Sequence, residues 1–255
     1  MSVTKPYKRL WRTLKGYDWG NNMNFGAPVP TLKYLADNRF ADQAEMQSLV
    51  TTAHLIIRDL YEIFDFVEPH EDNKKTYSHR IYELFLRAAT EFESNCKGIL
   101  KANAYPKSVK DMNNLDYFKI QDAAHLSGYS VTFELWSSNT VFKPFASWNE
   151  ATYAPLPWYQ SYNKVKHDRY NNFSEANLGN LMDAVAALIC ILHAQMGENM
   201  DEVCFEGFGT SQMDQNEVRN GTFTVKVPQF SDDEQYEFVW DVLKTDPNPV
   251  QNYTF

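Results

Sequence analysis

The sequence contains few cysteines and no long hydrophobic run. Its longest unbroken apolar run, residues 184–192, has nine residues, whereas a membrane-spanning helix needs about 20. We therefore expect no membrane segment, and the basic N-terminal residues lack the apolar stretch of a secretory signal. Only three cysteines occur, far apart in the sequence. This excludes a zinc site of the C-x-x-C type and is typical of a reducing cytoplasm, so we expect a cytoplasmic protein.

The chain also lacks an excess of positive charge. Its formal net charge is −9, and residues 196–255 hold twelve acidic and three basic residues, which accounts for all of it (3 − 12 = −9). A uniformly basic nucleic-acid-binding face is therefore excluded. One dense basic cluster precedes Asp18, and aromatic residues lie within it. It is either an arm that docks on the body or a contributor to RNA binding. Its members are Lys5, Lys8, Arg9, Arg12 and Lys15.

The familiar catalytic patterns are missing as well. We find no H-E-x-x-H, no Ser/His/Asp arrangement, no paired-carboxylate motif and no glycine-rich phosphate loop. The two glycines at 207 and 209 are too few for a nucleotide loop. We therefore expect neither a metal site nor a cofactor, and function must be sought in clusters of polar side chains.

Helical periodicity dominates the middle of the chain. Apolar residues recur at three- and four-residue steps in several segments, and the connections between these segments are short. This pattern predicts an up-and-down bundle over residues 41–197, preceded by a basic, irregular N-terminal arm over residues 1–40. The predicted helices are 41–67, 76–103, 115–126, 158–170 and 174–197.

Two β-rich segments accompany the bundle. Alternating apolar and polar residues predict a hairpin inserted at about 129–148, and an acidic, β-rich tail at 198–255 that packs on the helices. The predicted fold class is therefore mainly α, an up-and-down helical bundle with an inserted β-hairpin and a small β-rich C-terminal appendage.

The densest group of polar side chains lies near residue 165. Asn163 and His167 are four residues apart, so on a helix they share one face. An amide beside an imidazole can fix its tautomer, as general acid–base chemistry requires, although both residues are also common structural groups. Neighbouring cations could hold phosphate oxygens, and neighbouring tyrosines offer hydroxyls and stacking faces. These neighbours are Lys166, Arg169, Tyr162 and Tyr170.

A second polar pattern follows the predicted helix at 76–103. Four polar residues recur at four-residue steps, which on a solvated face would form a ladder of weak ion pairs worth a few tenths of a kcal/mol each. Apolar residues flank the stripe closely, so part of it could instead be sheltered and share a small polar cleft with Asn163 and His167. The stripe consists of His79, Glu83, Arg87 and Glu91.

The segment YNKVKHDR, which follows one helical hairpin and opens another, resembles the motif helix of HEPN domains. These domains are helical bundles found in many microbial toxin, defence and RNA-processing proteins. Their ribonuclease members carry an arginine, then a polar residue, then a histidine farther along. In this chain Asn163 and His167 match the last two positions, whereas Tyr162 replaces the arginine. The resemblance covers roughly residues 41–197.

The resemblance implies a HEPN-like cytoplasmic protein that binds RNA or a nucleotide in a microbial defence or stress system. It also implies a homodimer paired through the motif helices, and a partner protein of toxin–antitoxin type. By the same resemblance, Glu91 or Glu93 is the acidic residue that faces the motif. Arg169 or Arg87 could take the place of the arginine missing at Tyr162.

Two alternatives stay open. The first is a metal-independent endoribonuclease in which His167 acts as acid or base, Asn163 orients it, and Lys166 or Arg169 stabilises the phosphate. The second is a non-catalytic, dimeric interaction protein. The sequence therefore leaves open whether the chain is an enzyme.

Overall fold

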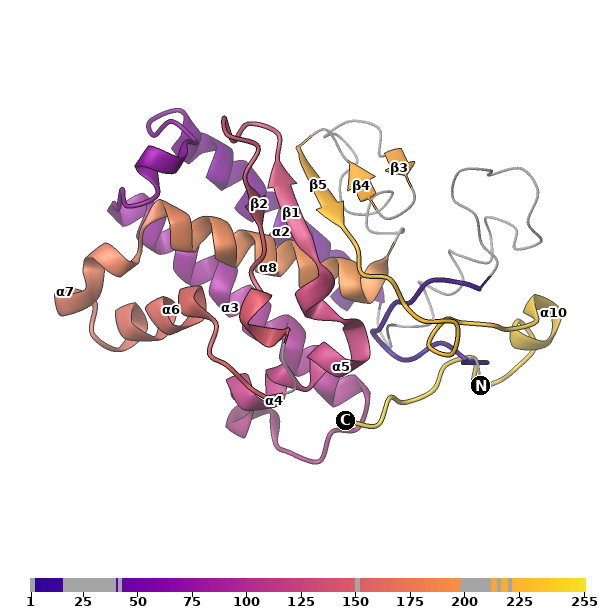
Figure 1. Ribbon diagram of the computed structural model, residues 1–255. Coiled ribbons are helices and arrows are strands. Elements are labelled where there is room, and N and C mark those ends of the chain that lie inside the picture. Colours follow the sequence, from indigo (N-terminus) through magenta and orange to yellow (C-terminus); the bar gives the residue numbers. More distant parts are fainter. Residues whose placement is uncertain are drawn as a thin grey trace.

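The computed structural model describes residues 3–15, 40, 43–149, 152–197, 212–214, 217–219 and 222–255. Within these ranges the chain is mainly helical with a small antiparallel sheet, as the periodicity predicted (Figure 1). The principal helices are α2 (Gln43–Phe64), α3 (His79–Ala102), α6 (Pro157–His167) and α8 (Leu178–Met196). The shorter ones are α4 (Asn114–Phe118), α5 (Ile120–Ala124), α7 (Arg169–Asn172) and α10 (Trp240–Leu243).

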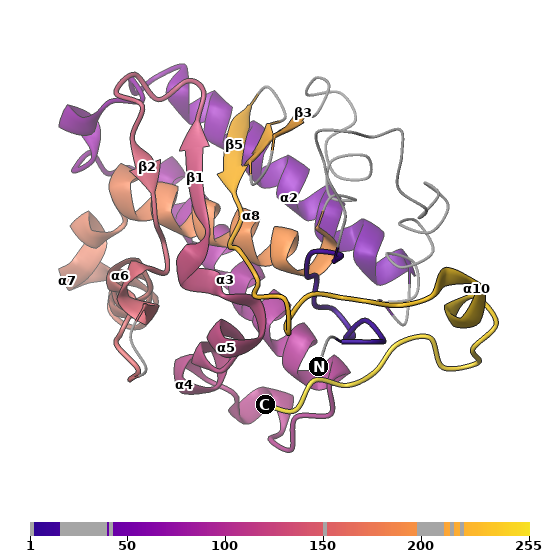
Figure 2. The ribbon, with the colours of Figure 1, turned by 45° about the vertical axis from the view of Figure 1, so that its right-hand side comes forward.

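Helix α8 is the core of the molecule. The Asn177 side chain caps its first turn by accepting a hydrogen bond from the Asn180 amide at 3.0 Å. Nearly every residue of α8 is buried, because α3 packs along one side and the sheet covers another (Figures 1 and 2). By length and hydropathy α8 could cross a membrane, but in this fold it is a core helix surrounded by protein.

Helix α3 is amphipathic and forms the main partner of α8. Ser78 caps its first turn by accepting from the Ile81 amide at 3.2 Å. Its buried face contains Phe85, Phe92 and Ile99, each with no exposed surface, and its opposite face carries the polar stripe. Both α2 and α6 contact α3, and the polar face of α3 is exposed between these two helices.

Two predicted helices are broken in the structure. The predicted helix at 115–126 is two short helices, α4 and α5, and α5 ends where His125 adopts a left-handed conformation (φ 52°). The predicted helix at 158–170 ends at His167, because Asp168 leaves helical geometry (φ −143°) and its carboxylate caps α7 through the Asn171 amide. Arg169 and Tyr170 therefore lie on a different helix from His167.

The sheet joins the predicted hairpin to the predicted tail. Strand β1 pairs antiparallel with β2 as a hairpin, and on its other edge β1 pairs with β5 from the tail in the register Val131 to Val225. The hairpin and the tail thus form one sheet in the order β2-β1-β5-β4-β3. The strands are β1 (Ser130–Phe133), β2 (Val141–Phe142), β3 (Gln212–Asp214), β4 (Glu217–Arg219) and β5 (Phe223–Lys226).

The basic N-terminal segment is docked on the body over residues 3–15. Arg9 is 3% exposed and forms an ion pair with Glu45 at 2.6 Å and a hydrogen bond with Gln195 at 2.8 Å. Arg12 is buried as well, and its guanidinium donates to the Ala123 carbonyl. These two cations are therefore structural, which favours the docked arm over an RNA-binding one. The remainder of the predicted arm, residues 16–39, lies outside the described residues.

Candidate functional site

Three of the predicted site residues meet where α6 packs on α3. The Lys166 ammonium donates to the Tyr162 hydroxyl at 2.9 Å and lies 3.8 Å from the Glu93 carboxylate. On its other side, Glu93 accepts a 2.5 Å hydrogen bond from the Tyr159 hydroxyl. Tyr162, Lys166 and Glu93 were each among the side chains expected at the site, and Tyr159 completes the group. We name these four residues the Glu93 cluster.

The Glu93 cluster is partly withdrawn from water, and its pKa shifts follow. Burial raises the pKa of Tyr159 far above its usual range, and the hydrogen bond to Glu93 raises it further. Burial lowers the pKa of Lys166, but the Tyr162 hydrogen bond and the Glu93 charge outweigh that effect, so its pKa is raised overall. Tyr159 is thus a neutral donor and Lys166 a cation, which makes the cluster a stable anchor for α6.

The expected cleft of Asn163 and His167 with an acidic residue is not formed. His167 is exposed at the end of α6 and Asn163 is half-buried, and no hydrogen bond or ion pair joins either of them to Glu91 or Glu93 in the described part of the chain. The reason is helical phase. Residues such as Tyr162 and Val165 turn towards α3 and α8, so the face that carries His167 turns outwards.

Glu91 and Arg87 also lie elsewhere than predicted. Arg87 pairs with Asp59 on α2, so it does not replace the missing motif arginine beside Asn163. Burial is the largest effect on Asp59 and raises its pKa, but the hydrogen bonds from Arg87 and Arg58 lower it more, and the carboxylate stays charged. Burial raises the pKa of Glu91, with Arg87 opposing the shift.

Arg169 and Tyr170 lie together on α7. The Arg169 guanidinium is stacked over the Tyr82 ring of α3, 5.7 Å from its centroid. The same ring packs against Phe173 with centroids 5.8 Å apart. Tyr170 is 93% exposed, and no ion pair of Arg169 occurs among the described residues. Arg169 is therefore a cation available to a ligand, with an exposed aromatic ring next to it.

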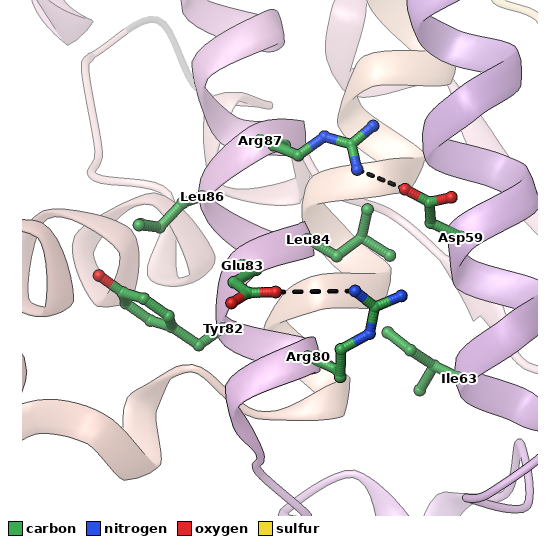
Figure 3. A pocket seen from close by; sticks show the side chains of 8 residues that line it. All are labelled: Asp59, Ile63, Arg80, Tyr82, Glu83, Leu84, Leu86 and Arg87. Atoms are coloured by element: carbon green, nitrogen blue, oxygen red, sulfur yellow. Dashed lines mark hydrogen bonds and ion pairs between the residues drawn. The ribbon is translucent and has the colours of Figure 1, made fainter.

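A pocket of about 440 Å³ lies beside this stack on the polar face of α3. Figure 3 shows Tyr82 and Leu86 on one side of α3, and Asp59 and Ile63 of α2 across from them on the other. Tyr82 lines the pocket, and the Arg169 guanidinium of α7 lies over its ring. The pocket and α7 therefore form one continuous surface, which we name the α3–α7 surface. The pocket residues are Asp59, Ile63, Arg80, Tyr82, Glu83, Leu84, Leu86 and Arg87.

Ion pairs join the charged groups of the pocket to one another and to α2. Arg87 binds Asp59 across the two helices, and Arg80 lies 3.3 Å from Glu62 and 3.7 Å from Glu83 (Figure 3). Two members of the predicted polar stripe therefore form surface pairs, Glu83 with Arg80 and Arg87 with Asp59 of α2. The stripe pointed to Glu83 and Arg87, but no sequence signal linked them to Asp59, because that contact joins two helices.

No group of three or more histidine, cysteine, aspartate or glutamate side chains is arranged to hold a metal ion within the described ranges. The α3–α7 surface contains guanidinium, carboxylate, amide, aromatic and aliphatic side chains. Comparisons of the chain with protein-family models, with curated proteins and with solved structures find no match.

Proposed function

We propose that this chain is a HEPN-like cytoplasmic protein that binds single-stranded RNA through the α3–α7 surface, in a microbial defence or stress system. The observation that carries the proposal is the Arg169 guanidinium, which is stacked on Tyr82 and makes no ion pair among the described residues. Proteins that hold single strands combine cations for the phosphates with aromatic rings for the bases. Arg169 supplies the first and Tyr170 the second.

The surroundings of Arg169 support the same function. His167 and Lys166 end α6 next to α7, and the Lys166 side chain is 46% exposed. A net charge of −9 disfavours non-specific attachment to nucleic acid, so a strand must be drawn to a local cationic group. At the α6–α7 end of the molecule Arg169 provides this charge, whereas Lys164 and Lys166 are already paired with Glu175 and Glu93.

The proposal is one of binding without cleavage. Tyr162 stands at the arginine position of the motif that this helix resembles, and it is 1% exposed with its hydroxyl bonded to Lys166. Asn163 makes no hydrogen bond that would orient His167 in the described part of the chain. An acid–base histidine needs such an orienting partner. The expectations of a homodimer and of an antitoxin-type partner stay predictions.

The test is fluorescence anisotropy with a labelled single-stranded RNA at several salt concentrations. Arg169→Ala should weaken binding several-fold and reduce the salt slope by about 0.7, the contribution of one phosphate contact to a single strand. Lys101→Ala, which removes one exposed charge from the far end of α3, is the matched control and should bind as wild type does. Wild-type protein that binds no RNA, or an Arg169→Ala variant that binds equally well, would overturn the proposal.

A further inference from the structure

We infer that the pocket between α2 and α3 is a subsite for one unpaired guanine base. The inference rests on the proposed RNA binding and names the base that the strand presents to this pocket. It follows from the charge of the lining, from its donors and acceptors, and from its shape.

The charge balance of the pocket argues for a neutral group. Its lining contains two guanidiniums, Arg80 and Arg87, and two carboxylates, Asp59 and Glu83, so its net charge is zero (2 − 2 = 0). A phosphate placed there would meet the two carboxylates at close range, which costs free energy. Arg169, by contrast, makes no ion pair with a carboxylate among the described residues, so its charge is available to a phosphate. The strand therefore places its backbone at α7 and a base in the pocket.

The polar groups of the pocket match the edges of guanine. Guanine presents two adjacent acceptors, O6 and N7, which suit the fork of an arginine. It also presents two adjacent donors, N1–H and the 2-amino group, which suit one carboxylate. Arg80 and Glu83 have side chains that are 66% and 61% exposed, and they lie 3.7 Å apart. Such a surface pair is weak and can open towards a ligand at little cost.

The other bases match less well. Adenine has a donor where guanine has O6, so a guanidinium fork finds one acceptor there instead of two. Uracil and cytosine are smaller, and neither offers two adjacent donors to Glu83 together with two adjacent acceptors to Arg80. Guanine is the base that satisfies both side chains at once.

The apolar part of the pocket suits a flat ring. Tyr82 and Leu86 supply apolar surface on one side of α3, and Ile63 borders the pocket on the side of α2 (Figure 3). A volume of about 440 Å³ lies in the lower part of the range of small-ligand pockets and is enough for one nucleoside. Phe173 packs against the Tyr82 ring and Arg169 lies over it, so this wall of the pocket is held in position before a base arrives.

The experiment compares four labelled oligouridylates that differ at one central position, which is guanine, adenine, cytosine or uracil. Wild-type protein should bind the guanine oligonucleotide about tenfold more tightly than the others, as expected for one bidentate base contact. Glu83→Gln should abolish this preference, because an amide supplies one acceptor where the carboxylate supplies two. Glu68→Gln, the matched control, removes an exposed carboxylate beyond the end of α2 and outside the pocket lining, and it should keep the preference.

The outcomes separate this inference from the proposed function. Arg169→Ala should weaken binding of all four oligonucleotides equally and leave the guanine preference in place. Equal binding of all four by wild type, or a preference that survives Glu83→Gln, would overturn the guanine subsite and leave RNA binding intact. Failure to bind any of the four would overturn both.

Discussion

His193 is the residue most out of keeping with its surroundings. It has no exposed surface and lies between the rings of Trp11 and Tyr129, with centroids 5.9 Å away in both cases. Neither ring nitrogen of His193, nor the Tyr129 hydroxyl, has a hydrogen-bond partner among the described residues. Burial lowers the pKa of His193 from 6.5 to about 4, so the folded protein holds it neutral.

We therefore predict that acid destabilises the fold through His193. Between about pH 6.5 and pH 4 the unfolded chain binds a proton on this side chain and the folded chain does not, so stability falls as the pH falls. The total effect is about 3 kcal/mol. Urea unfolding at pH 7 and pH 4.5 should show a smaller loss for His193→Leu than for wild type. Replacement of an exposed histidine, His167→Gln, should behave as wild type, and an equal loss in the His193 variant would contradict the prediction.

Asp183 on α8 has the opposite dependence on pH. Burial raises its pKa from 3.8 to about 6, and nearby Lys74 only partly offsets this. The folded state therefore binds a proton that the unfolded state has lost between about pH 3.8 and pH 6, and stability falls as the pH rises through that range. Asp183→Asn should stabilise the protein at pH 7 by on the order of 2 kcal/mol and have little effect at pH 4. Thermal unfolding at both pH values checks this, and destabilisation at pH 7 would contradict it.

At the scale of elements, the periodicity of the sequence predicted most helices, but it did not predict how the helices contact one another. Helix α3 was predicted at 76–103 and is His79–Ala102, because a 3.6-residue apolar period is a property of the segment itself. The break at Asp168 was missed because the apolar pattern continues past it, and a side-chain cap ended the helix instead.

At the candidate site, too, the sequence indicated individual residues but not the contacts between them. The composition around residue 165 drew attention to Lys166, Tyr162 and Arg169, of which Arg169 lies on the α3–α7 surface and the other two lie in the Glu93 cluster. The phase of α6, which turns His167 outwards, depends on how α6 packs on α3 and α8. Likewise, the pairing of Arg87 with Asp59 joins residues 28 apart in the sequence. No periodicity predicts such contacts.

The N-terminal segment is an element whose basic residues stabilise the fold. Arg9→Ala should lower the free energy of unfolding by about 2 kcal/mol, because it leaves the buried Gln195 carbonyl without its donor and removes packing under α2. Lys5→Ala, which breaks a surface ion pair with Asp246 and an exposed hydrogen bond to the Asn248 carbonyl, should have a small effect. Urea unfolding measures the difference. The salt dependence of RNA binding should be the same in both variants as in wild type. A reduced slope in either variant would indicate that the N-terminal segment contacts RNA.

At the scale of the whole molecule, the two ends of the described chain are interlocked. Residues Val3 and Tyr7 pair with Tyr236 and Gln251 as parallel bridges. The Tyr236 hydroxyl donates to the Leu10 carbonyl at 2.8 Å, and the Tyr253 amide donates to Asn103 on the helical body. The segments at 3–15 and 236–255 therefore run side by side on one flank of the bundle (Figures 1 and 2).

The contacts between residues 3–15 and 236–255 limit the order in which the native structure can form during synthesis on the ribosome. Synthesis proceeds from the N-terminus, and helices such as α2 and α3 can form as they emerge. The segment at 3–15, although it emerges before α2 and α3, meets its partners Ala194, Tyr236 and Gln251 only after they have been made in turn. Leu10 and Trp11 thus lack these native contacts while α2 and α3 are being made, and a segment translated before the helices is among the last to reach its native contacts.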